Sequence, residues 1–257
     1  MDFRVAAIGL LVGLLIGMTG MGGGAVMTPA LILLGWARPL VAVGTDMVWS
    51  TLTRAMGAAV HLRQKTVDFV LVKRLAIGSI PGALAGLALM AHLHHQGGDA
   101  LDKLVLRLLG AALICVALSL FLRSLRRKAT GENSRELPDR RGPVWLTTVV
   151  AFVVGFLVSL TSVGSGSLIV AGLVVIYPNT PLRRIVGSDI VHALLLVGVA
   201  ALGHLGVGEV NFRLLGALLV GSIPGVWIGS RLSAVFPEKI LRPVLATTLM
   251  VLGYKLL

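Results

Sequence analysis

The residues of this chain that could do chemistry lie within otherwise apolar stretches. Asp46 and Asp189 follow a Gly-Thr and a Gly-Ser pair, in VGTDMV and VGSDIV. Arg54 comes about two helical turns after Asp46, in the same apolar segment. Ionisable groups within apolar spans are costly and are commonly functional. Arg54 could therefore bind an anionic substrate or neutralise Asp46.

The two aspartates have more than one interpretation. As paired acids in apolar segments, Asp46 and Asp189 are candidates for proton coupling. Because each follows a small residue and a hydroxyl residue, each could instead cap a helix N-terminus near the membrane interface. Together with His192, they could also serve as the acid–base groups of an intramembrane enzyme.

Two glycine- and serine-rich runs interrupt the apolar sequence, TGMGGGAVM from residue 19 and TSVGSGSLI from residue 161. Consecutive glycines point in different directions around a helix, so a single packing interface does not explain them. A sharp turn here exposes backbone N–H groups beside the positive end of the next helix, which favours an anion. The predicted substrate-binding residues are Thr19, Gly20, Gly22, Gly23, Gly24, Thr161, Ser162, Gly164, Ser165, Gly166, Ser167 and Arg54.

The composition requires a lipid environment for these residues. Of the 257 residues, 56% are apolar and 13% are charged, whereas soluble domains are about a quarter charged. Continuous apolar runs recur along the chain and predict membrane-spanning helices. The net charge of +12 is attributed to basic cytoplasmic loops, so no nucleic-acid partner is predicted. The single Cys115 excludes an intrachain disulfide.

The chain contains an internal duplication with an offset of 143 residues, the separation of Asp46 and Asp189. The glycine-rich runs repeat one residue out of step, and Arg54 corresponds to Val197. The other repeated motifs are VDF (67–69) with VNF (210–212), and GSIPG (78–82) with GSIPG (221–225).

We predict an all-α integral membrane protein made of two repeats, residues 1–122 and 144–257, joined by a basic cytoplasmic linker at 123–143. Each repeat is expected to contain about five helical segments, and its first two should form a hairpin broken at the glycines. The expected segments are 4–20, 24–35, 41–61, 70–91, 101–122, 144–160, 166–177, 184–204, 212–232 and 238–256.

An odd number of segments predicts that the second repeat is inverted in the membrane. With the linker inside, cytoplasmic ends collect 16 Lys and Arg residues and outer ends collect six. If each first pair were a single broken span, the repeats would be parallel and the tally would be 14 to 8. The inverted arrangement fits the positive-inside rule better and places both termini outside.

Other glycines recur every fourth residue, and this spacing favours close helix packing rather than a ligand site. They form three sets: Gly9, Gly13 and Gly17; Gly78, Gly82 and Gly86; and Gly221, Gly225 and Gly229.

The glycine-rich opening, the AVGTD segment, VDF and the repeated GSIPG resemble the TauE/SafE sulfite exporter family of membrane permeases over nearly the whole chain. The resemblance implies a duplicated bacterial inner-membrane transporter for sulfite, sulfonates or related sulfur-containing organic anions. It also assigns the glycine-rich runs to the functional region. The second copy departs from three consecutive glycines, since Ser165 separates Gly164 and Gly166.

These observations predict a secondary transporter of a small anion, working by alternating access around a midplane site at the broken helices. An intramembrane enzyme and an anion channel are the alternatives. The chain lacks the P-loop pattern of ATP-driven pumps, and neither a cofactor nor a metal is expected. The predicted partners are the substrate and the lipid bilayer, and assembly into a homo-oligomer is left open.

Overall fold

The computed structural model describes residues 3–19, 23–96, 98–126, 142–207, 209–232 and 238–257. Within these ranges the chain forms ten α-helices and no strand. The helices are α1 (Phe3–Thr19), α2 (Gly24–Leu33), α3 (Pro39–Arg63), α4 (Phe69–Gln96), α5 (Gly98–Arg126), α6 (Val144–Thr161), α7 (Ser167–Ile176), α8 (Leu182–Val207), α9 (Phe212–Leu232) and α10 (Glu238–Leu256).

Each predicted segment corresponds to one helix. Several helices are longer than predicted because their ends carry polar residues beyond the apolar stretch. For example, α5 continues to Arg126, although the apolar run ends near residue 122. Most of the predicted linker, 127–141, lies outside the described residues.

Five of the described helices, α4, α5, α6, α8 and α9, are long and apolar enough to span a membrane. Large apolar side chains are exposed on their outer faces, including Leu202 at 71% and Trp227 at 58%. Exposed apolar surface of this kind fits contact with lipid. α3 is not among the five although it has 25 residues, because it carries Asp46, Arg54 and several hydroxyl residues.

Two short helices, α2 and α7, have 10 residues each. At 1.5 Å per residue, each covers about half of the ~30 Å hydrocarbon core. α6 and α7 are separated by the turn 162–166. The corresponding break between α1 and α2 includes residues 20–22, which lie outside the described residues.

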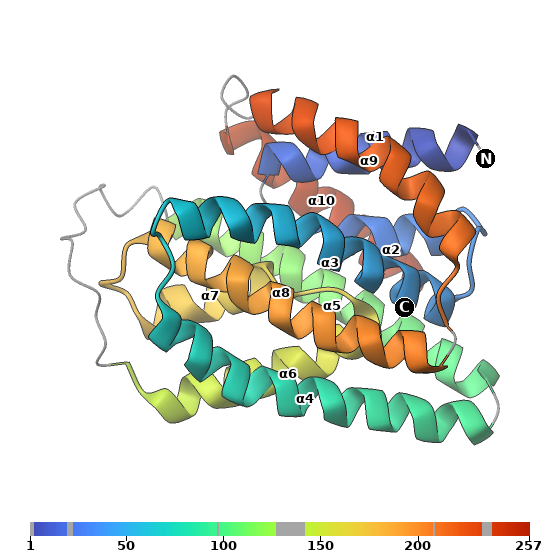
Figure 1. The fold of residues 1–257 in the computed structure, drawn as a ribbon, viewed down its shortest axis with the longest axis horizontal. Helices are drawn as coiled ribbons and strands as arrows, with labels where there is room; N and C mark the ends of the chain where they lie inside the picture. Colours follow the sequence, from blue (N-terminus) through green and yellow to red (C-terminus); the bar gives the residue numbers. More distant parts are fainter. Residues whose placement is uncertain (1–2, 20–22, 97, 127–141, 208, 233–237) are drawn as a thin grey trace.

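Long helices from the two halves of the chain pack as pairs: α1 against α9, α4 against α6, α3 against α8, and α5 against α10 (Figure 1). The glycines spaced by four residues lie in these contacts. A Cβ at Gly13 would lie 2.8 Å from the Cα of Ser222, and one at Gly82 would lie 3.0 Å from the Cα of Phe152. The packing role predicted for the glycine sets is therefore confirmed for α1 and α9 and for α4 and α6.

Hydrogen bonds between the halves follow the offset of the duplication. Trp49 Nε1 on α3 donates to Ser222 Oγ on α9 at 2.7 Å. At the corresponding positions, His192 Nε2 on α8 lies 2.7 Å from Ser79 Oγ on α4. The third helix of each half is thus bonded to the fourth helix of the other.

The remaining repeated motifs cap α4 and α9. Thr45 Oγ1 accepts a hydrogen bond from the backbone N–H of Asn211 at 3.0 Å, and Asn211 Oδ1 accepts one from Leu214 N at 3.0 Å. In the other half, the backbone N–H of Asp68 donates the equivalent hydrogen bond to Ser188 Oγ at 2.8 Å. These hydrogen bonds tie the third helix of each half to the start of the fourth helix of the other half.

α3 and α8 lie side by side at the centre and run in opposite directions (Figure 1). α1 begins and α10 ends on one side of the molecule, while α5 ends and α6 begins on the opposite side. The largest cluster of buried apolar side chains is formed mainly by α3, α4, α6 and α8.

Candidate functional site

The turn between α6 and α7 requires unusual backbone angles at two positions. α6 ends at Thr161, and its C-cap Ser162 has φ of 61°. Gly164 has φ of 106°, a conformation that favours glycine because it has no Cβ. Gly166 is the N-cap of α7. The second glycine-rich run therefore forms a tight turn, as its composition predicts.

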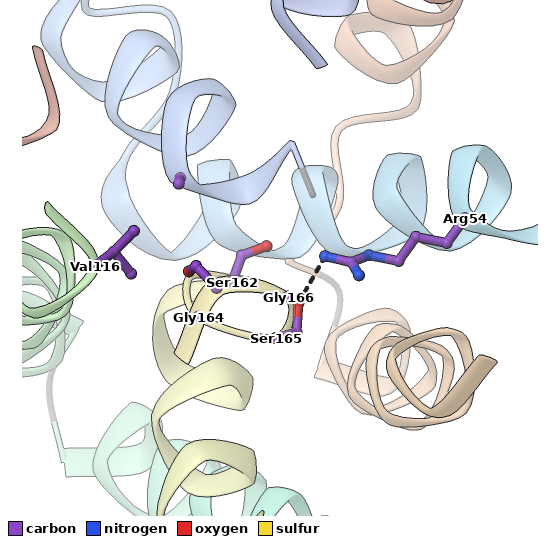
Figure 2. Close-up of a pocket in the computed structure, with 8 residues that line it drawn as sticks. Arg54, Val116, Ser162, Gly164, Ser165 and Gly166 are labelled. Carbon is purple, nitrogen blue, oxygen red and sulfur yellow. Dashed lines mark hydrogen bonds between the residues drawn. The ribbon is translucent and has the colours of Figure 1, made fainter. Parts of the chain in front are cut away.

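A cavity lies beside this turn, where α2, α3 and α5 approach it (Figure 2). The cavity is open on one side, and the space at this site is about 280 Å³ when the open solvent at its mouth is included. Five of its lining residues come from the turn and the first residue of α7, and Arg54 is its one charged lining residue among those described. The lining residues are Ala25, Arg54, Val116, Ser162, Gly164, Ser165, Gly166 and Ser167.

Arg54 extends from α3 into this cavity (Figure 2). Its guanidinium Nη2 donates a hydrogen bond to Ser165 Oγ at 2.7 Å. Its Nε is buried and has no hydrogen-bond partner in the described part of the chain. Because buried donors are almost always satisfied, an unpaired N–H of this kind favours an acceptor that is not part of the protein.

Asp46 is fully buried one turn before Ser50 on the same face of α3 as Arg54. Its Oδ2 accepts hydrogen bonds from Thr28 Oγ1 at 2.9 Å and from Ser162 Oγ. Its Oδ1 lies 3.5 Å from Ser50 Oγ. Asp46 therefore joins three elements: α3, the short helix α2 of its own half, and the turn of the second half.

The N-cap interpretation of the two aspartates is wrong. α3 begins at Pro39 with Arg38 as its N-cap, and α8 begins at Leu182, so Asp46 and Asp189 lie inside their helices. The preceding Thr45 and Ser188 are not N-caps of α3 and α8 either. Their hydroxyls instead accept hydrogen bonds from backbone N–H groups in the loops before α9 and α4.

Asp189 has different surroundings from Asp46. Its Oδ1 is 3.9 Å from Nδ1 of His192, which is fully buried and contacts Ser79 through Nε2. Asp46 bonds to Ser162, which lines the cavity.

The structure places the other predicted residues as follows. Gly24 packs against Ser162, and a Cβ on it would lie 3.0 Å from Asp46 Oδ2. Gly23 has ordinary helical angles and faces the ring of Trp49 rather than the cavity. Thr161 Oγ1 donates to the carbonyl of Leu157 at 2.7 Å within α6.

Gly20, Gly22 and the side chain of Thr19 lie outside the described residues. Sequence reasoning did not single out Ala25 and Val116, which line the cavity, or Thr28, which bonds to Asp46. The spacing of Asp46, Ser50 and Arg54 by four residues was the available signal for Ser50. The described part of the chain has no cluster of three or more His, Cys, Asp or Glu residues that could hold a metal ion.

Apolar helices with lipid-type outer faces, arranged around buried charged groups, define an integral membrane protein of the polytopic helical class. The sequence profile of the sulfite exporter TauE/SafE family matches residues 5–256. The chain therefore belongs to the sulfite exporter TauE/SafE family, whose members are membrane transporters of the inner membrane of bacteria.

Curated relatives carry the same general description. The chain is 41% identical to the probable membrane transporter protein YjnA of Bacillus subtilis over 100% of both chains. It is 28% identical to the probable membrane transporter protein YunE of the same organism, over 91% of this chain and 88% of that protein. No solved structure matches the chain.

Proposed function

We propose that this protein is a secondary transporter of a small anion, with sulfite or an organosulfonate as its substrate. The observation that carries the proposal is Arg54, a half-buried cation that lines a cavity and bonds to Ser165 of the glycine-rich turn. In a low-dielectric site, one arginine and neighbouring hydroxyls can replace much of the hydration of an oxyanion. Family membership supports a sulfur oxyanion.

The two halves are proposed to be inverted repeats that alternate access to this cavity. The antiparallel courses of α3 and α8 and the reciprocal contacts of Trp49 with Ser222 and of His192 with Ser79 support this arrangement. Inverted repeats with short, interrupted helices commonly hold substrate near the membrane midplane. The enzyme alternative is less favoured, because His192 and Ser79 are fully buried and do not line the cavity.

The inverted arrangement predicts that Gln64 and Gly206 lie on opposite sides of the membrane. Both positions are exposed, and an added Cβ at Gly206 meets no atom within 4 Å. In a Cys115→Ala background, Gln64→Cys should react with an impermeant maleimide only from the cytoplasmic side. Gly206→Cys should react only from outside. Labelling of both cysteines from the same side would contradict the inverted arrangement.

The transport proposal is tested with purified protein in liposomes. Vesicles loaded with unlabelled sulfite should accumulate external labelled sulfite transiently above its equilibrium level, because a carrier couples efflux to influx. Sulfite and methanesulfonate should each be tested as the internal counter-substrate, with empty liposomes as the control. A channel gives rapid equilibration without this overshoot, so flux without an overshoot would reject the carrier mechanism.

A further inference from the structure

We propose that His192 is the residue that carries a coupling proton in this transporter, within a buried unit that it forms with Asp189 and Ser79. This inference rests on the proposed function, since it names the ion that moves together with the anion. The proton binds the imidazole ring from the water on one side of the membrane and leaves to the water on the other side. The ring therefore alternates between a neutral and a singly positive state.

The first observation is the surroundings of the imidazole ring. α8 lies between α3 and α4 (Figure 1), and its His192 is fully buried. Nε2 lies 2.7 Å from Ser79 Oγ on α4, whereas Nδ1 is buried and has no hydrogen-bond partner among the described residues. Asp189 Oδ1, one turn earlier on α8, is 3.9 Å from Nδ1. A proton on Nδ1 would thus have a carboxylate beside it as its counter-charge.

Ser79 can keep its hydrogen bond to His192 in both protonation states of the ring. A hydroxyl group donates to an unprotonated ring nitrogen and accepts from a protonated one. With Ser79 beside Nε2 and Asp189 beside Nδ1, the ring can gain and lose a proton while each nitrogen stays next to a polar group. The geometry therefore suits a titrating group better than a fixed structural contact.

The first half of the chain forms the same bond without a group that can titrate. Trp49 Nε1 donates to Ser222 Oγ at the positions that correspond to His192 and Ser79. An indole N–H only donates, so this bond has a single protonation state. Both bonds join one half to the other, and a proton on His192 therefore acts at a contact between the two parts that are proposed to move.

The charged groups around His192 leave Asp189 as its counter-charge in the described part of the chain. The helices that pack on α8 are α3, α4, α6 and α7, and neither α6 nor α7 contains a titratable residue. Within α3, Asp46 and Arg54 each bond to a serine of the turn after α6. The other titratable residues of α3, α4 and α8 lie in the first or last two turns of these helices: His61, Arg63, Lys73, Arg74, His92, His94, His95, Arg183, Arg184 and His204.

His192 and Arg54 lie at a similar depth in the molecule. A Cβ added to Gly57 on α3 would be 3.5 Å from Ile190 Cγ2 on α8. Because the two helices run antiparallel, Arg54 and His192 both lie within one helical turn of this contact and on the same side of it. A proton on His192 and an anion at Arg54 have opposite charges, so each should favour binding of the other.

Proton coupling is tested in liposomes with labelled methanesulfonate, which keeps one negative charge across the neutral pH range and does not itself respond to a pH gradient. The membrane potential is clamped with potassium and valinomycin. An interior about one pH unit more alkaline than the exterior should drive about tenfold accumulation, because one proton enters with each anion. The opposite gradient should drive none.

Three variants test whether His192 carries the proton. His192→Gln places an amide nitrogen where Nε2 was but cannot take up a proton, so it should retain counterflow of methanesulfonate and lose the accumulation. Asp189→Asn, which removes the counter-charge, should behave in the same way and decides the question if His192→Gln does not fold. Ser222→Ala is the matched control: it breaks the bond of Trp49 and should accumulate methanesulfonate like the unmodified protein.

The outcomes separate this inference from the proposed function. Counterflow without accumulation in the unmodified protein would leave the carrier in place and overturn proton coupling. Equal accumulation by the unmodified protein and His192→Gln, or by the unmodified protein and Asp189→Asn, would overturn the role of this unit. If neither methanesulfonate nor sulfite shows counterflow, the proposed function falls and the inference falls with it.

Discussion

Arg54→Gln is expected to weaken binding of methanesulfonate by about 100-fold and to abolish counterflow. The substitution removes the one cation among the described lining residues of the cavity, together with its charge-assisted bond to Ser165. Loss of one partner of a desolvated charge pair between protein and ligand costs about 2–5 kcal/mol of binding free energy, and 1.4 kcal/mol corresponds to a tenfold change in affinity. Calorimetry and counterflow should be measured on the same preparation.

Two further substitutions test whether the effect depends on the position and the guanidinium group of Arg54. Arg63→Gln on the same helix removes an exposed cation and should leave affinity unchanged. Arg54→Lys keeps the charge but loses the planar arrangement of donors, so it should recover only part of the affinity. Normal binding by a folded Arg54→Gln protein would mean that the substrate occupies another part of the molecule.

Gly225→Ala is expected to lower stability severely, by about 3 kcal/mol, because overpacking of a close interface usually costs 1–3 kcal/mol and here the neighbour is backbone. A Cβ at Gly225 would overlap the carbonyl of Leu10 on α1 and would lie 3.0 Å from the backbone nitrogen of Leu14. Backbone atoms in the middle of a helix cannot move aside as a flexible side chain can. The measurement is the melting temperature of the purified protein in detergent.

Gly216 provides a matched control on the same helix, since an added Cβ there meets no atom within 4 Å. Gly216→Ala should not lower stability, and it should raise it by up to about 1 kcal/mol because alanine is the better helix former. Gly82, which corresponds to Gly225 in the first half, faces the backbone of Phe152, so Gly82→Ala should be as damaging as Gly225→Ala. Equal melting temperatures for Gly225→Ala and Gly216→Ala would contradict the close packing of α1 and α9.

Much of the fold could be predicted from sequence because lipid imposes strong rules on it. Backbone groups in hydrocarbon must bond internally, so apolar runs had to be helices, and their lengths followed from membrane thickness. Helix ends were less predictable: α5 extends to Arg126 because basic residues can continue a helix into the headgroup region. Glycines repeated at every fourth position indicated packing, but not which helix they face.

The residues of the candidate site could be predicted from the sequence, but the hydrogen bonds that join them could not. An arginine and two aspartates within apolar segments, and a Gly-Ser run, stand out in the sequence because such groups are costly in membranes and are rarely incidental. Local sequence does not reveal that Asp46 bonds to Ser162, 116 positions away, or that Arg54 bonds to Ser165, 111 positions away. Those contacts depend on how the halves interlock.

The sequence by itself determined the class of protein, the ten helices and the duplication, since each follows from composition, apolar periodicity and repetition along the chain. Only the tertiary structure decided that the two aspartates are unequal and that neither is a helix cap. It also decided that Gly23 packs on Trp49 while Gly164 lines the cavity. The physical reason is that near-identical motifs acquire different neighbours when Val197 and His192 stand where the first half has Arg54 and Trp49.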